Sequence, residues 1–250
     1  MTQPVRECSL AAMIKGFLLD IERLDYPSAL ELMRGLAGAR QSGLVPEVLI
    51  LLEHDPVVTL GRRGGVQDLL VSEDRLRSQG IAVHRVERGG QATYHGPGQL
   101  VGYPVCRLKS LGLGVSDFAH KLEEAALAAL AHMGVQAGTR PDHPGVWVDG
   151  RKVASLGLAV RRGVTIHGLA LNVDPDLDHF GLISPCGLGP GVITSLARLL
   201  DRPVDPVELR RAFAQSFSRI FQVELIPWTL EQAREMAGRA LAPDASNTGV

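Results

Sequence analysis

The sequence predicts a single α+β domain built around a mixed, largely antiparallel sheet with helices on its flanks. Helix-like and strand-like segments alternate along the 250 residues. Two turn signals, Asp149-Gly150 and Arg162-Gly163, join three strand-like runs as consecutive hairpins. A hairpin joins antiparallel strands, so the sheet cannot be purely parallel.

The strands are predicted from apolar runs that either alternate or are continuous. The continuous run Val48 to His54 is typical of a central strand that is buried on both faces. The other predicted strands are Phe17 to Leu24, Ile81 to Arg88, Leu100 to Val105, and the hairpin runs that begin at Gly145, Arg151 and Val164.

The helices are predicted from their capping residues. Ser28 and Glu31 have capping-box spacing, and Gly43 closes that first helix. A short helix begins at Ser72, the longest runs from about Ser116 to Met133, another short one lies near Ile193, and Asp205 caps the last. We expect residues 1–16 to be an N-terminal extension, 17–241 the domain, and 242–250 a disordered tail.

The composition excludes several classes of protein. The net charge is −1, so no global field attracts the chain to nucleic acid or to an anionic membrane. The three cysteines, Cys8, Cys106 and Cys186, include no CxxC pair, which indicates reduced thiols rather than a disulfide framework. The N-terminal apolar run is too short for a signal peptide, so we expect a soluble, cytoplasmic protein with no membrane partner.

Cys186 stands in the stretch SPCGLGP, between a proline and a glycine. A packing cysteine prefers the interior of a strand or helix. A reactive cysteine prefers a loop where backbone N–H groups and a cation stabilise its thiolate. Lys152, which follows the Asp149-Gly150 turn, would lie in solvent if it were an ordinary lysine. A lysine held near a thiol would instead lower the pKa of that thiol.

The stretch RGGQATYHGPGQLVGYP, from Arg88 to Pro104, is either a plain hairpin loop or a loop whose backbone approaches a ligand closely. Its glycine spacing fits neither a dinucleotide fingerprint nor a P-loop. Four histidines are further candidates, but none has the spacing of a zinc site, and we expect no metal and no cofactor. They are His54, His95, His143 and His167.

Four motifs in order resemble the lipoate biosynthesis protein B family of octanoyl-[acyl-carrier-protein]:protein N-octanoyltransferases. They are RGGQATYHGPGQLVGYP, GVWVDGRKVASLGLAVRRGVTIHGLALNV, DLDHFGLISPCGL and GVITSL. The resemblance covers about 17–230. It implies a catalytic fold like that of biotin and lipoate protein ligases. It also implies an acyltransferase that moves an octanoyl group from acyl carrier protein to a lysine of a lipoyl domain.

The same resemblance assigns roles to individual residues. Cys186 matches the nucleophile that forms an acyl-thioester, and Lys152 its partner that lowers the thiol pKa and acts as acid and base. The substrate-binding positions are Arg88, Gly89, Gly90, Gln91, Ala92, Thr93, Tyr94, His95, Ser155, Leu156, Gly157, Gly168, Leu169 and Ala170. The implied acceptors are apo lipoyl domains of 2-oxoacid dehydrogenase complexes and the glycine cleavage H protein.

Three other functions stay open on the sequence. An ATP-dependent lipoate or biotin ligase would share the fold but would need no cysteine. A non-catalytic module would bind the lipoyl domain or the carrier only. Nucleic-acid binding is disfavoured by the net charge. We hypothesise instead that Arg62, Arg63, Arg161 and Arg162 form a docking face for an acidic acyl carrier protein.

Overall fold

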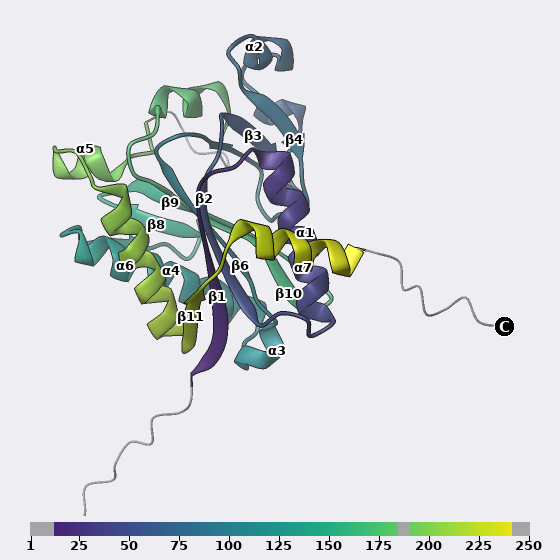
Figure 1. Cartoon of the computed structure of the whole chain (residues 1–250). Helices are drawn as coiled ribbons and strands as arrows, with labels where there is room; N and C mark the ends of the chain where they lie inside the picture. The colour runs from purple at the N-terminus through teal and green to yellow at the C-terminus, as the bar shows by residue number, and fades with distance from the viewer. Residues whose placement is uncertain (1–12, 185–190, 242–250) are drawn as a thin grey trace, which may run out of the picture.

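Helices cover both faces of a large central sheet in the computed structural model, which describes residues 13–184 and 191–241 (Figure 1). Most of the predicted N-terminal extension and the whole predicted tail lie outside these ranges. Strand β1 (Ile14–Arg23) begins three residues earlier than predicted. Cys186 also lies outside the described residues.

The central sheet has eight strands in the order β11-β1-β2-β6-β10-β9-β8-β7. Strand β1 pairs in parallel with β11 and β2, and the other pairs are antiparallel, which confirms the mixed, largely antiparallel sheet. The strands beyond β1 are β2 (Glu47–Glu53), β6 (Gln99–Val105), β7 (Gly138–Thr139), β8 (Gly145–Val148), β9 (Arg151–Arg161), β10 (Val164–Asn172) and β11 (Val223–Pro227).

Strand β2 explains why its sequence reads as a continuous apolar run. Leu49 and Leu51 pack into the core that contains α4 (Val115–His132) and α6 (Pro206–Phe221). The alternate residues, including Ile50, pack into the core that contains α1 (Tyr26–Gln41) and α7 (Leu230–Leu241). Both faces of the strand are therefore buried between helical layers.

A second, three-stranded sheet was not predicted. Its order is β4-β3-β5, formed by β4 (Ala82–Arg85), β3 (Val57–Leu60) and β5 (Ala92–His95). Each strand has four residues, and β5 lies inside the glycine-rich stretch, where no strand periodicity can be read. The short elements are η1 (Val66–Asp68), α2 (Glu73–Ser78), α3 (Leu108–Leu111), η2 (Leu177–Leu182) and α5 (Leu196–Leu200).

Two helix caps differ from the prediction. Helix α1 is capped by Asp25, whose Oδ1 accepts the Ser28 N–H at 2.9 Å, and not by Ser28. Pro27 allows this earlier start because its missing N–H has no partner to lose in the first turn. Helix α4 begins after Gly114 rather than Ser116. The predicted caps Ser72 and Asp205 are confirmed.

Both hairpin turns of the β8–β9–β10 meander are confirmed. Asp149 and Gly150 have φ values of 48° and 75°, and Arg162 and Gly163 have values of 48° and 80°. Two consecutive positive φ angles are what a type I′ turn requires. The meander places β9 and β10 side by side, with the glycine-rich loop crossing them.

Candidate active site

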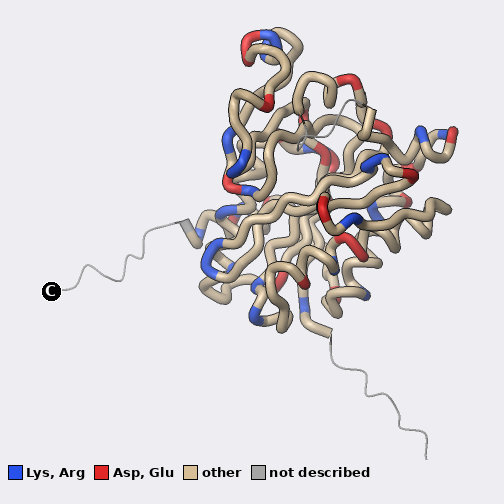
Figure 2. The backbone as a smooth tube through the Cα atoms, turned by 180° about the vertical axis from the view of Figure 1, so that it is seen from behind, with Lys and Arg blue, Asp and Glu red and all other residues tan. Residues whose placement is uncertain are grey.

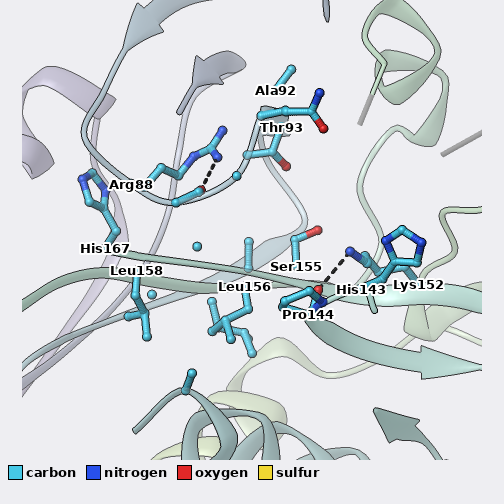
Figure 3. A pocket seen from close by; sticks show the side chains of 18 of the residues that line it. Arg88, Ala92, Thr93, His143, Pro144, Lys152, Ser155, Leu156, Leu158 and His167 are labelled. Atoms are coloured by element: carbon cyan, nitrogen blue, oxygen red, sulfur yellow. Dashed lines mark hydrogen bonds between the residues drawn. The ribbon is translucent and has the colours of Figure 1, made fainter. Parts of the chain in front are cut away.

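A cavity of about 440 Å³ lies between the glycine-rich loop and the strands β9 and β10 (Figure 3). Fourteen predicted site residues line it. They are Arg88, Gly89, Gly90, Gln91, Ala92, Thr93, His95, Lys152, Ser155, Leu156, Gly157, Gly168, Leu169 and Ala170. The structure thus brings together three segments that are far apart in the sequence.

Tyr94 is the predicted, described site residue that does not line the cavity. The Tyr94 side chain packs instead into the core of the small sheet with Phe180 and Ile183. There its hydroxyl is hydrogen-bonded to Nδ1 of His179 at 2.8 Å. Burial raises the pKa of Tyr94 to about 12. Tyr94 therefore packs the small sheet.

Arg88 fixes the glycine-rich loop at one end of the cavity. Its buried guanidinium donates to the carbonyl of Thr59 at 2.6 Å, to Oγ1 of Thr59, and to the carbonyl of Gly89 at 2.9 Å. The Gly89 N–H in turn donates to the Leu158 carbonyl of β9 at 2.8 Å. A Cβ on Gly157 would lie 3.1 Å from both Arg88 Cδ and the Gly89 oxygen, so glycine permits this close approach.

Lys152 lies at the opposite end of the cavity, as Figure 3 shows. The lysine is 6% exposed, contrary to the usual position of a lysine beside a turn. Its Nζ donates to the Pro144 carbonyl at 3.0 Å and lies 4.9 Å from the centroid of the Trp147 ring. The β8–β9 register shifts at Trp147, a bulge that re-aims side chains locally.

The Lys152 backbone holds the chain that follows Cys186 in sequence. The Lys152 N–H donates to the Val192 carbonyl at 2.7 Å, and the Thr194 N–H donates to the Lys152 carbonyl at 2.9 Å. The side chain of Asn172 donates to the Thr194 carbonyl at 2.9 Å and accepts from Gln99. Six positions separate Cys186 from Val192, so Lys152 pairs with a segment close in sequence to the predicted nucleophile.

The backbone that presents the Pro144 carbonyl is fixed from two sides. The Gly145 N–H donates to Oε1 of the buried Glu123 at 2.6 Å. Nε1 of Trp147 donates to the His143 carbonyl at 3.0 Å. Burial raises the pKa of Glu123. Glu123 was not predicted from the sequence, because it stands beside Glu124 in a helical stretch and nothing in that stretch indicates which carboxylate faces inward.

The buried histidines in and beside the cavity are neutral. Burial lowers the pKa of His54 to about 4, the pKa of His95 well below its usual value, and the pKa of His167. His95 Nδ1 is hydrogen-bonded to Gln99 Oε1 at 3.1 Å. Within residues 13–184 and 191–241, no group of three or more His, Cys, Asp or Glu side chains could hold a metal ion.

His167 occupies a strained position in the middle of β10. Its φ of 59° is rare for a residue with a side chain, and the imidazole is buried against the cavity with Nε2 lying 3.6 Å from Glu87. Glu87 also forms a bidentate ion pair with Arg34 at 2.8 and 3.0 Å. The nearby imidazole of His167 and the hydrogen-bonded guanidinium of Arg34 together hold the pKa of Glu87 below its usual range, against its burial.

Several cavity residues were not among the individually predicted site positions, and most of them come from elements distant in the sequence. They are Tyr26, Arg63, Tyr103, Val115, Ala119, Asp142, His143, Pro144, Leu158, His167 and Ile193, of which His143 and His167 had been considered only as metal ligands. Tyr103 belongs to the glycine-rich motif itself. Of the chain's three cysteines, the structure describes Cys106, whose buried thiol has a raised pKa and is unsuited to act as a nucleophile.

No helix in the described part of the chain is long and apolar enough to cross a membrane. The fold and its cavity define a class of catalytic domain, a mixed sheet with an apolar pocket that ends at a buried lysine. Residues 25–218 match the family model of the lipoyl protein ligase A/B catalytic domain. The chain belongs to this family.

Comparison with known proteins shows which members of this family the chain is similar to. The chain is 44% identical to an octanoyltransferase of Solibacter usitatus, with 84% of this chain and 94% of the relative covered. It is 42% identical to an octanoyltransferase of Syntrophobacter fumaroxidans, with 83% and 91% covered. A bipartite lipoate protein ligase of Thermoplasma acidophilum has a similar structure, with a TM-score of 0.70, 20% identity, and 90% and 91% covered. That likeness shows the fold, and confirms the predicted ligase-like architecture.

Proposed function

We propose that this acyltransferase moves an octanoyl group from octanoyl-acyl carrier protein to a lysine of a lipoyl domain, through a thioester on Cys186. Octanoyl transfer is the activity of its relatives at 44% and 42% identity. The observation that supports the covalent route is the placement of Lys152. This buried lysine borders the cavity, and its backbone pairs with the segment that follows Cys186 in sequence.

The first step exchanges one thioester for another. An ammonium on Lys152 favours the Cys186 thiolate, whose sulfur attacks the octanoyl carbonyl. The carbon–sulfur bond to the carrier breaks, and the carrier thiolate leaves with a proton from Lys152. Because bonds of the same kind break and form, the step is nearly isoenergetic and needs no ATP.

The second step forms an amide. Lys152, now neutral, accepts a proton from the incoming lysine amine of the lipoyl domain. The amine attacks the acyl carbon, the bond to Cys186 breaks, and the thiolate is regenerated. Backbone N–H groups near Gly187 and in the glycine-rich loop would stabilise the oxyanion. An amide is more stable than a thioester, so this step makes the overall reaction downhill.

The cavity provides an apolar environment for the acyl chain. Leu156, Leu158, Leu169 and Ala170 line it between Lys152 and the Arg88 end. Burying each methylene contributes about 0.8 kcal/mol, so a chain that fills the pocket gains affinity with each carbon. The buried His95 and His167 are neutral, so neither ring adds a charge to the pocket wall that the acyl chain would have to desolvate.

The experiment that tests this function supplies purified lipoyl domain and octanoyl-acyl carrier protein without ATP. We expect the lipoyl domain to gain one octanoyl group, detected by intact mass, and free octanoate with ATP to give no product. Transfer from free octanoate that depends on ATP would contradict the proposal and identify a ligase.

A further inference from the structure

A groove rich in arginine adjoins the cavity on the Arg88 side. Arg34, Arg62, Arg85 and Arg161 line it together with Glu87 and the partly exposed Val160. Four arginines and one glutamate give this arginine groove a charge of +3, although the whole chain has a net charge of −1. In Figure 2, several Lys and Arg segments gather along one flank of the molecule, on the side where helix α7 ends.

Most of the positive charge in the arginine groove is not neutralised. Arg34 is paired with Glu87 at 2.8 Å. Arg62, Arg85 and Arg161 are exposed, and within the described part of the chain none of the three forms an ion pair at 4.0 Å or less. Val160 is 37% exposed and adds an apolar contact between the arginines. This combination suits a protein surface that carries carboxylates around a small apolar patch.

The arginine groove and the cavity share a wall. At positions 62–63, 87–88 and 158–159, one residue of each adjacent pair lines the groove and the other lines the cavity. A partner seated in the groove would therefore lie at the margin of the acyl-binding site. Of the four arginines hypothesised from the sequence, Arg62 and Arg161 line the groove, whereas Arg63 lines the cavity.

The distance from the groove to Lys152 distinguishes the donor from the acceptor. Along β9, seven residues separate Lys152 from Ala159, or about 23 Å at about 3.3 Å per residue. The acceptor's lysine side chain is too short to reach the reacting centre from a domain docked there. The donor's thioester is carried on a long, flexible phosphopantetheine arm, which suits a remote docking surface.

We infer that the arginine groove docks the acidic face of the acyl carrier protein that delivers the octanoyl thioester. This inference rests on the proposed function for the identity of the donor. The groove holds the carrier by charge complementarity, and the phosphopantetheine arm extends past the shared wall toward Lys152. Charges at the rim of an interface chiefly change the association rate and its dependence on salt.

The test reverses two charges, in the variant Arg62→Glu/Arg161→Glu. We expect the KM for octanoyl-acyl carrier protein to rise about tenfold or more, with little change in kcat. Octanoyl-pantetheine and octanoyl-phosphopantetheine, which lack the protein, should be used as well as by the parent. A matched control, Arg211→Glu/Arg219→Glu on the exposed face of α6, makes the same change of charge away from the groove and should leave every constant unchanged.

Three results would overturn the inference. One is an unchanged KM for octanoyl-acyl carrier protein. Another is a rise in the KM for the lipoyl domain instead, which would make the groove an acceptor surface. The third is an equal loss with octanoyl-phosphopantetheine, which would make it a phosphate site. Direct titration with acyl carrier protein that bears only phosphopantetheine separates the docking inference from the proposed function. The parent could bind this carrier, and the groove variant fail to bind it, even if the parent transfers no octanoyl group. That result would contradict the proposed function and support the arginine groove as the docking site.

Discussion

Glu123 is a buried carboxylate that acts on Lys152 through the backbone of residues 143–145. It accepts the Gly145 N–H at 2.6 Å, and the neighbouring Pro144 carbonyl accepts from Lys152 Nζ at 3.0 Å. Gly145 has a φ of 125°, and a Cβ there would lie 2.3 Å from the Ala154 oxygen. The carbonyl is therefore presented by a conformation that needs both a glycine and an external acceptor.

Replacing Glu123 should disturb catalysis through this backbone. We expect Glu123→Ala to lower kcat/KM for octanoyl transfer by about fivefold to 150-fold, because an unmade buried hydrogen bond costs about 1–3 kcal/mol. Glu123→Gln keeps an acceptor oxygen and should recover most of the activity. The exposed neighbour in Glu124→Ala is the matched control. The second readout is the pH dependence of the rate of Cys186 alkylation. If Glu123 only stabilised the fold, this pH dependence would be the same in every variant that folds.

His54 should make the fold sensitive to acid. Its Nδ1 is bonded to the Leu24 carbonyl at 2.7 Å and its Nε2 to the Tyr103 hydroxyl at 2.8 Å, so the buried ring is neutral. Burial lowers its pKa to about 4 in the fold. The unfolded chain, with a pKa of about 6.5, binds a proton first as the pH falls. The contribution of the neutral His54 to the unfolding free energy is therefore fully present above pH 6.5 and is lost as the pH falls toward 4.

Between pH 7 and pH 5 this histidine alone should cost about 2 kcal/mol of unfolding free energy. Denaturant titrations at several pH values give the unfolding free energy of the parent and of His54→Gln, which has no group to titrate at this position. The two slopes of unfolding free energy against pH are then compared. The parent should lose stability more steeply than the variant over this interval. Equal slopes would mean that His54 is not the group responsible.

At the scale of elements, the start of α1 can be tested directly. The Asp25 carboxylate caps the helix by accepting the Ser28 N–H, and this bond lowers the pKa of Asp25. We expect Asp25→Ala to destabilise the fold by about 1 kcal/mol, whereas Ser28→Ala should change little. Thermal unfolding of the two variants shows which residue caps the helix. A larger loss of stability in Ser28→Ala than in Asp25→Ala would support the cap predicted from the sequence.

The elements show which features a sequence can reveal. The two hairpin turns and the buried strand β2 were predicted because glycine placement and apolar runs are local signals. The strands β3 and β5 were missed because four residues carry too little periodicity. Tyr94 was predicted to bind substrate, but its side chain packs into the core of the small sheet, a tertiary contact that the glycine-rich motif does not reveal.

Other parts of the site depend on contacts that no local pattern encodes. The pairing of Lys152 with residues 192–194 and the support from Glu123 join separate elements. The resemblance to a family identified fourteen of the cavity residues, because its motifs mark residues that the fold brings together at the site. Glu123 lies outside those motifs and was found only in the structure. Arg62 and Arg161 of the arginine groove had been hypothesised from the sequence, but the wall that the groove shares with the cavity is visible only in the structure.

For the whole molecule, the fold alone does not determine the chemistry. The same architecture occurs in a lipoate protein ligase at 20% identity, whereas the relatives at 44% and 42% identity are octanoyltransferases. The two chemistries differ in the source of activation, which is ATP for a ligase and a thioester for a transferase. A covalent acyl-enzyme is therefore the feature that separates them.

The most direct measurement is an intact-mass spectrum after mixing the protein with octanoyl-acyl carrier protein. The parent should gain one octanoyl group that a lipoyl domain then removes. Cys186→Ser should gain none, and Lys152→Ala should acylate at least about a hundredfold more slowly, the lower range for general acid–base catalysis. A parent that forms no adduct while still transferring octanoate, or an adduct that persists in Cys186→Ser, would contradict the proposed mechanism.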